Sequence, residues 1–108
     1  MKSVEELVRE YLPQVPVMQF ATSKHDQPWL CALHFVNDDD LNLYWVSEAK
    51  RRHSQELASN KKAAAYVLVH VNSKKEDYVI GISLEGTARE VSASDHPEVV
   101  ESYVSKHH

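Results

Sequence analysis

The chain contains 108 residues, which predicts a single domain, and its formal net charge of −4 gives no general attraction to nucleic acids or anionic membranes. One cysteine excludes an internal disulfide and favours a reducing cytoplasm, and two glycines argue against a glycine-rich phosphate loop. The chain opens on an amphipathic pattern rather than a signal peptide, and it holds no apolar run of roughly 20 residues. We therefore expect a soluble cytoplasmic protein that contacts neither nucleic acid nor membrane.

The first third of the chain predicts a helix followed by two strands. Apolar residues recur at helical spacing over residues 3–12, where Ser3 and Glu6 form a capping-box pattern. Residues 17–23 predict a first strand. Residues 28–37 are almost continuously apolar, so we expect a second strand that is covered on both faces.

The middle of the chain predicts a turn, a strand and a helix in direct succession. The aspartates at 38–40 predict a turn in which the carboxylates bond their own backbone. Residues 41–47 alternate like a strand, and residues 49–59 predict a helix with Asn60 as its C-cap. This junction of strand and helix is the most informative part of the sequence.

The predicted helix begins with a cluster of cations. Lys50, Arg51 and Arg52 precede His53 at an end where backbone N–H groups are unpaired and the helix dipole is positive. Three cations there destabilise a helix unless an anion balances them, so a solvated cationic face is a weak explanation. We therefore interpret Ser47, Arg52 and His53 as an anion site, for which a phosphate is the natural ligand.

The last third of the chain predicts two long strands and a helix. Residues 62–72 and 78–91 read as strands that flank a charged turn at 73–77. Gly81 and Gly86 lie inside the second of these strands, where glycine often marks a bulge or a sharp bend.

The final helix begins near Asp95, which we expect to cap it together with Glu98, while Pro97 occupies its first turn. The total is five strands and three helices joined mostly by tight polar turns. That pattern predicts a mainly β, α+β protein with a small antiparallel barrel and flanking helices.

Two further sets of residues have a functional and a structural interpretation. Cys31 and His34 have the spacing of a metal pair, but residues three apart on a strand point to opposite faces, so we expect neither a metal site nor a nucleophile–base pair. His34 and His70 lie within apolar strands, and a structural role is favoured for both over a ligand role. The strand aromatics could stack on a planar ring, although core packing or an interface is the better default.

A recognisable pattern extends through the middle of the chain: a strand ending in a hydroxyl, then an Arg-His pair, a leucine and an asparagine on a helix, and then a further strand. Its members are Ser47, Arg52, His53, Leu57 and Asn60, followed by residues 63–68 and, on a later strand, Gly81, Gly86 and Arg89. In order and spacing the chain resembles the pyridoxamine 5′-phosphate oxidase-like FMN-binding split barrels, and within them a short bacterial subgroup.

The resemblance implies a homodimer that binds FMN in grooves at the subunit interface. It also implies that residues 1–108 form a single FMN-binding split-barrel domain, which is truncated or minimal at its C-terminus. In such proteins the strand-end hydroxyl and the helix cations hold the phosphate, and the isoalloxazine ring runs along the second strand. By position the cofactor residues are Cys31, Ala32, Leu33, His34, Ser47, Arg52 and His53.

The resemblance also implies a flavin reductase-like oxidoreductase acting on a small redox substrate with NAD(P)H or another electron donor, without an identified catalytic residue. The second strand lacks the arginine and lysine of true pyridoxamine phosphate oxidases, which argues against pyridoxal phosphate synthesis. The alternative is a non-enzymatic dimer that binds haem or deazaflavin, or that regulates without flavin. Haem would need an axial ligand such as His34 or His70.

Overall fold

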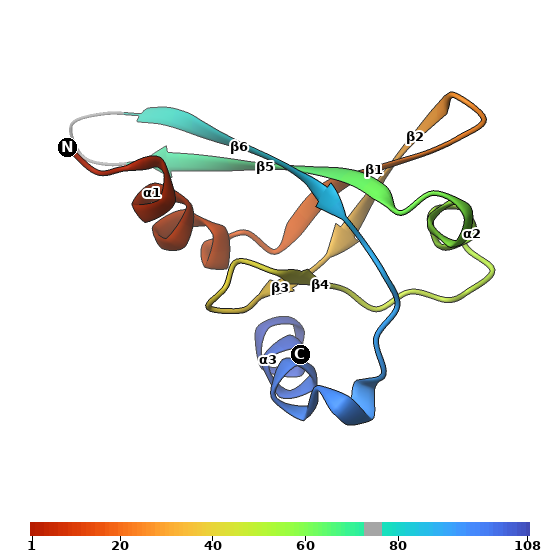
Figure 1. Cartoon of the computed structure of the whole chain (residues 1–108). Coiled ribbons are helices and arrows are strands. Elements are labelled where there is room, and N and C mark those ends of the chain that lie inside the picture. The colour runs from red at the N-terminus through yellow and green to blue at the C-terminus, as the bar shows by residue number, and fades with distance from the viewer. Residues whose placement is uncertain (73–76) are drawn as a thin grey trace.

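The computed structural model describes residues 1–72 and 77–108, and it shows six strands, three α-helices and two short 3-10 turns (Figure 1). The elements are α1 (Val4–Tyr11), β1 (Val17–Lys24), β2 (Gln27–His34), β3 (Val36–Asn37), β4 (Leu43–Tyr44), α2 (Arg52–Ser59), β5 (Lys62–Asn72), β6 (Asp77–Thr87) and α3 (Pro97–His107), with 3-10 turns at Leu12–Gln14 and Ala93–Asp95. The predicted class, a mainly β, α+β protein with antiparallel strands and flanking helices, is confirmed. Among the described residues, no helix is long and apolar enough to cross a bilayer.

The strands form two antiparallel sheets, one with the order β2-β1-β5-β6 and a small one of β3 and β4. Residues directly opposite each other share a face of a sheet, so the pairing of Phe20 with both Cys31 and Ala65 defines the inner face. The core on this face combines residues from the sheet, from the turn after α1 and from the segment after β2. Its buried members are Leu12, Val15, Met18, Phe20, Phe35, Val67, Val69 and Ile82.

The outer face of the large sheet is apolar and exposed. Leu30, Tyr66, Leu68 and Val79 retain between 41% and 61% of their accessible surface. A hollow of about 470 Å³ opens on this face, where small alanine side chains lie between Leu30 and Tyr66. The prediction that the second strand is covered on both faces is therefore wrong for this chain, because β2 covers the core with one face only.

Several predicted boundaries move inward in the structure. The strand predicted at 28–37 is two strands, because Phe35 turns completely into the core between β2 and β3. The strand predicted at 41–47 keeps only the two residues of β4. Helix α2 begins at Arg52 rather than at 49, after a turn in which the Arg51 N–H donates to the Glu48 carbonyl.

The C-terminal predictions are corrected in the same way. Strand β6 ends at Thr87, and the predicted Asp95 cap is wrong, since His96 is the N-cap of α3 and makes no side-chain capping bond. Pro97 occupies the first turn of α3 as predicted. Figure 1 places α3 against the β3–β4 sheet, on the side away from the β5–β6 hairpin.

The expected glycine bulges are absent, because the β5–β6 pairing runs without interruption from Lys62↔Thr87 to Asn72↔Asp77. Gly81 instead accommodates its neighbour on the outer face, since a β-carbon at this position would collide with the hydroxyl of Tyr66. Of the charged turn predicted at 73–77, residues 73–76 lie outside the described residues.

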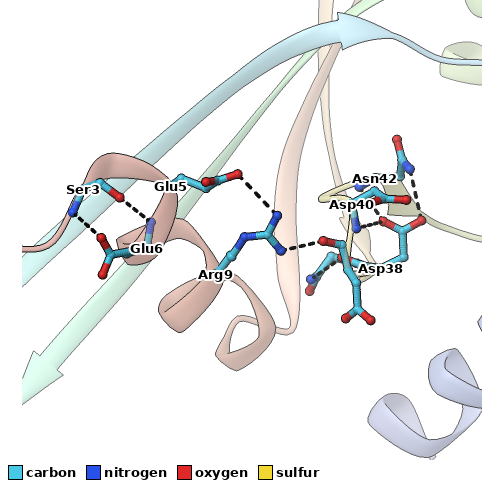
Figure 2. A network of polar contacts seen from close by, with 9 residues as sticks. Ser3, Glu5, Glu6, Arg9, Asp38, Asp40 and Asn42 are labelled. Carbon is cyan, nitrogen blue, oxygen red and sulfur yellow. Dashed lines mark hydrogen bonds and ion pairs between the residues drawn. The ribbon is translucent and has the colours of Figure 1, made fainter.

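Helix α1 is tied to the β3–β4 turn by one arginine (Figure 2). The Ser3–Glu6 capping box forms as predicted, and Arg9 donates to the Asp39 backbone carbonyl. Within the turn, the Asp38 carboxylate accepts bonds from the backbone N–H groups of Asp40 and Asn42, at 3.0 and 2.8 Å. The aspartate turn therefore has the self-bonded form that the sequence predicts.

Candidate functional site

The first turn of α2 is seated on the inner face of β2. Trp29 and Cys31 are alternate residues of β2 and share that face. The Arg52 guanidinium lies 4.0 Å from the centre of the Trp29 ring, and Nδ1 of His53 lies 3.5 Å from Sγ of Cys31. Two successive side chains of α2 thus engage two successive inward positions of β2.

His53 is buried, and both of its ring nitrogens have partners. Nε2 lies 2.7 Å from Oγ of Ser47, opposite the contact of Nδ1 with Cys31, and the ring meets Phe20 edge-on. Burial, with a smaller contribution from the charge of Arg51, lowers the pKa of His53, while burial raises the pKa of the Cys31 thiol. At neutral pH the contact therefore joins a neutral imidazole and a protonated thiol.

A buried carboxylate fixes Arg52. Nε of Arg52 donates to one oxygen of Glu56 at 2.8 Å, and the Thr22 hydroxyl donates to the other oxygen at 2.8 Å. The bond from Arg52, and then the bond from Thr22, lower the pKa of Glu56, which keeps this carboxylate ionised. Because the ion pair uses Nε, the terminal nitrogens of the guanidinium bring four further N–H donors to this end of α2.

Two of the three cations at this helix start have carboxylate neighbours within the chain. Lys50 pairs with Glu48 at 3.3 Å, and Arg52 pairs with Glu56. The cluster is therefore less dependent on an external anion than the sequence alone implies. Arg51 is the N-cap and makes no side-chain capping bond in the described chain, and the first turn of α2 has no acidic residue.

The residues predicted to line a ring are divided between the two faces of β2. Cys31 and Leu33 point toward the core, whereas Ala32 and His34 are exposed on the outer side. The His34 ring lies 4.9 Å from that of His107 in α3. The structure therefore brings Cys31 together with Ser47 and His53, and it leaves His34 at the opposite end of the strand.

The edge position of β2 exposes part of its backbone. In the order β2-β1-β5-β6, β2 pairs only with β1 among the described strands. One side of its backbone therefore presents N–H and C=O groups that no neighbouring strand uses.

Sequence reasoning missed two residues of this region, Thr22 and Glu56, and it considered Trp29 only as a strand aromatic that could stack on a planar ring. The spacing of Arg52 and Glu56, four apart on a helix, is a recognisable ion-pair pattern that could have identified the carboxylate. Thr22 carries no comparable signal, because only the folded sheet brings it to α2. The contact of Cys31 with His53 was missed for the same reason.

Comparison with known proteins agrees with this architecture. The chain is similar in structure to the flavocytochrome Anf3 from Azotobacter vinelandii, with a TM-score of 0.73 and 16% identity over 97% of this chain and 52% of the other. It is also similar to Atu2129, a protein of unknown function from Agrobacterium tumefaciens, with a TM-score of 0.69 and 14% identity over 96% of this chain and 46% of the other.

A third similar structure is HutZ, the heme storage protein from Vibrio cholerae, with a TM-score of 0.69 and 13% identity over 98% of this chain and 77% of the other. The chain thus spans about half the length of Anf3 and Atu2129. No curated protein sequence matches it significantly. The sequence pattern of the pyridoxamine 5′-phosphate oxidase family matches residues 4–108, nearly the whole chain, and the protein therefore belongs to that family.

Proposed function

We propose that the protein is an FMN-binding homodimer that acts as a flavin reductase-like oxidoreductase. The observation that carries the proposal is the preorganised pair of donors at the start of α2. Ser47 is held through His53 and Arg52 is held through Glu56, so both side chains have fixed positions before any ligand arrives. Donors that are fixed in advance lose little conformational entropy when they bind.

The chemistry of this end of α2 suits a phosphate monoester. The terminal nitrogens of Arg52 match phosphate oxygens geometrically, the Ser47 hydroxyl can donate, and the first N–H groups of α2 lie at the positive end of its dipole. His53 holds the Ser47 hydroxyl and does not itself contact the phosphate, because both of its ring nitrogens already have partners. We therefore assign the direct phosphate contacts to Ser47 and Arg52.

The edge of β2 suits the ring. An isoalloxazine carries acceptors and a donor along one rim, and the backbone of an edge strand offers complementary groups. The neighbouring residues Cys31, Ala32, Leu33 and His34 are the ring-side residues of the proposal. FMN, when bound, supplies the hydride and electron chemistry, so the protein needs to contribute only orientation and shielding from solvent.

The exposed outer face supports a dimer. Leu30, Tyr66, Leu68 and Val79 form an exposed apolar surface, a feature that marks interaction sites on proteins. A second copy that covers this face would also enclose a ligand lying along β2. The lone cysteine is consistent with a cytoplasmic location, and the substrate would be a small redox molecule.

The test is a titration of FMN followed by quenching of flavin fluorescence. Arg52→Ala should weaken binding by about 1.5–3 kcal/mol, because it removes a charged hydrogen-bond donor. Lys2→Ala is the matched control, since Lys2 precedes α1, away from α2, and the change removes one charge there (Figure 1). Equal dissociation constants for the two variants would show that the phosphate binds elsewhere.

Haem is the second candidate ligand. It is favoured by the descriptions of two similar structures, a flavocytochrome and a heme storage protein, and by the exposed His34 at the end of β2. Titration with hemin should then give a Soret band that His34→Ala shifts or abolishes. The absence of a Soret band would remove haem as a candidate, and a band that does not depend on His34 would show that another residue is the axial ligand.

Turnover separates an enzyme from a binding protein. FMN-loaded protein that oxidises NADH or NADPH in the presence of an electron acceptor would support the reductase assignment. Full FMN binding without turnover would favour a sensing or storage role.

A further inference from the structure

A chain of three polar side chains connects β2 to the proposed anion site. Cys31 contacts Nδ1 of His53 at 3.5 Å, and Nε2 of His53 contacts the Ser47 hydroxyl at 2.7 Å. The imidazole between them is only 6% exposed, whereas Ser47 faces solvent. Cys31 and Ser47 contact opposite nitrogens of the same imidazole, so the direction of the hydrogen bond at one end fixes the direction at the other.

Only two directions are open to a neutral imidazole, which has one donor and one acceptor nitrogen. In the first, the thiol donates to Nδ1, Nε2–H donates to Ser47, and the Ser47 proton is left to point outward. In the second, Nδ1–H points at the sulfur, Ser47 donates inward, and an oxygen lone pair faces the site. A phosphate accepts hydrogen bonds, so only the first direction suits it.

The chemistry of the thiol end favours the first direction. Imidazole nitrogen is a good acceptor and thiol sulfur a poor one, so S–H to Nδ1 is a better bond than Nδ1–H to sulfur. The thiol is protonated and the ring is neutral in this environment, as described above. The ring cannot donate from both nitrogens without taking up a charge in a buried position.

We propose that Cys31 is a positioning residue: its thiol proton holds His53 in the Nε2–H tautomer, so that Ser47 accepts from His53 and directs its own proton to the anion. The His53 tautomer is a property of the protein alone. The effect on the anion rests on the proposed function.

The tautomer is tested by ¹⁵N NMR of the imidazole in the intact chain, without ligand. The wild type should show a protonated Nε2 and an unprotonated Nδ1 for His53. Cys31→Ser keeps a donor and should preserve this pattern, while Cys31→Ala removes the donor and should give a mixture of tautomers. A wild-type Nδ1–H tautomer, or an unchanged pure Nε2–H tautomer in Cys31→Ala, would overturn the proposal.

The effect on the ligand is tested by titrating FMN and, separately, inorganic phosphate. Cys31→Ala should raise the FMN dissociation constant by about threefold to tenfold, the effect expected from one neutral hydrogen bond, and Cys31→Ser should restore most of the affinity. A matched pair in the Ser47→Ala background should show no further loss from Cys31→Ala, because the hydroxyl that Cys31 orients is then missing.

The outcomes distinguish a failure of this inference from a failure of the proposed function. If wild-type protein binds neither FMN nor phosphate while the tautomers behave as expected, the proposed function fails and the positioning of Ser47 stands. If FMN binds but Cys31→Ser is as weak as Cys31→Ala, or if the loss persists without Ser47, Cys31 acts through packing or through the flavin ring and the inference fails.

Discussion

Helices α2 and α3 contact the rest of the molecule in different ways. In α2, the two buried residues His53 and Glu56 are polar, and their polar side-chain atoms meet partners on other elements or on the same helix. In α3 no residue is fully buried, and the Lys106 amine is enclosed without a hydrogen-bond partner among the described residues. The helix at the candidate site is thus fixed by directed bonds, and the other helix mainly by packing.

Helix α3 packs through contacts with aromatic and imidazole rings. The Lys106 amine lies 4.2 Å from the centre of the Phe35 ring, and His107 contacts both the His34 ring and the Phe35 carbonyl. Burial lowers the pKa of Lys106, which shows that its charge is poorly compensated. A buried polar group is inexpensive when it is paired and costly when it is not, so the two helices should respond oppositely to loss of a polar group.

Thr22→Val should have the largest effect. The change keeps the shape of the side chain but removes the hydroxyl that donates to buried Glu56, and we expect a loss of about 1–2 kcal/mol in the free energy of unfolding. Urea denaturation measures it. Thr22→Ser, which keeps the hydroxyl, should retain the bond to Glu56. An unchanged stability in Thr22→Val would mean that the Glu56 network does not fasten α2.

Lys106→Met should act in the opposite direction. It keeps the long side chain over Phe35 and removes an enclosed amine that has no hydrogen-bond partner among the described residues, so we expect a gain of about 1 kcal/mol in the same assay. Lys62→Met, on an exposed position of β5, is the control for a general effect of lost charge. A destabilised Lys106→Met variant would show that the amine has a partner that stabilises the folded chain.

Mild acid should give the smallest effect, through His53 in α2. The pKa of His53 is lowered in the folded state, so between that pKa and the ordinary value near 6.5 the unfolded chain binds more protons. Stability should therefore fall as the pH drops below about 6.5. His53→Gln should flatten this part of the profile, while His25→Gln, in an exposed turn, should not. Equal slopes for the three proteins would contradict the assignment.

Much of the fold is predictable because its signals are local. The capping box of α1, the limits of β5 and the aspartate turn all depend on residues close together in sequence. The break between β2 and β3 was not predicted, because Phe35 looks like any other residue in an apolar run, and its burial is decided by packing against α3 and the core. The exposure of the outer face of β2 is equally invisible in composition.

The candidate site was likewise predictable where its signals are local and unpredictable where they depend on the folded sheet. Ser47, Arg52 and His53 were selected as candidates from charge and helix position, and the structure places Ser47 and His53 in contact. The orientation of His53 was not predictable, because its partner Cys31 is 22 residues away and reaches it only across the folded sheet. The sequence implied that the cations at the start of α2 need an external anion to balance them. The ion pairs of Lys50 and Arg52 within the chain reduce that need.

The turn between β3 and β4 contains a left-handed residue that is not glycine, and an ionised aspartate, Asp38, accepts the hydrogen bonds of the turn. Leu41 has a φ of 63°, a left-handed conformation that is unfavourable for leucine, while its side chain packs against the core. Partial burial alone would raise the pKa of Asp38, but its bonds from Asn42, Tyr44 and Asp40 outweigh this and lower it. Strong acid that neutralises Asp38 would therefore loosen the loop whose backbone accepts the hydrogen bond from Arg9. Helix α1 would then lose its contact with the β3–β4 turn.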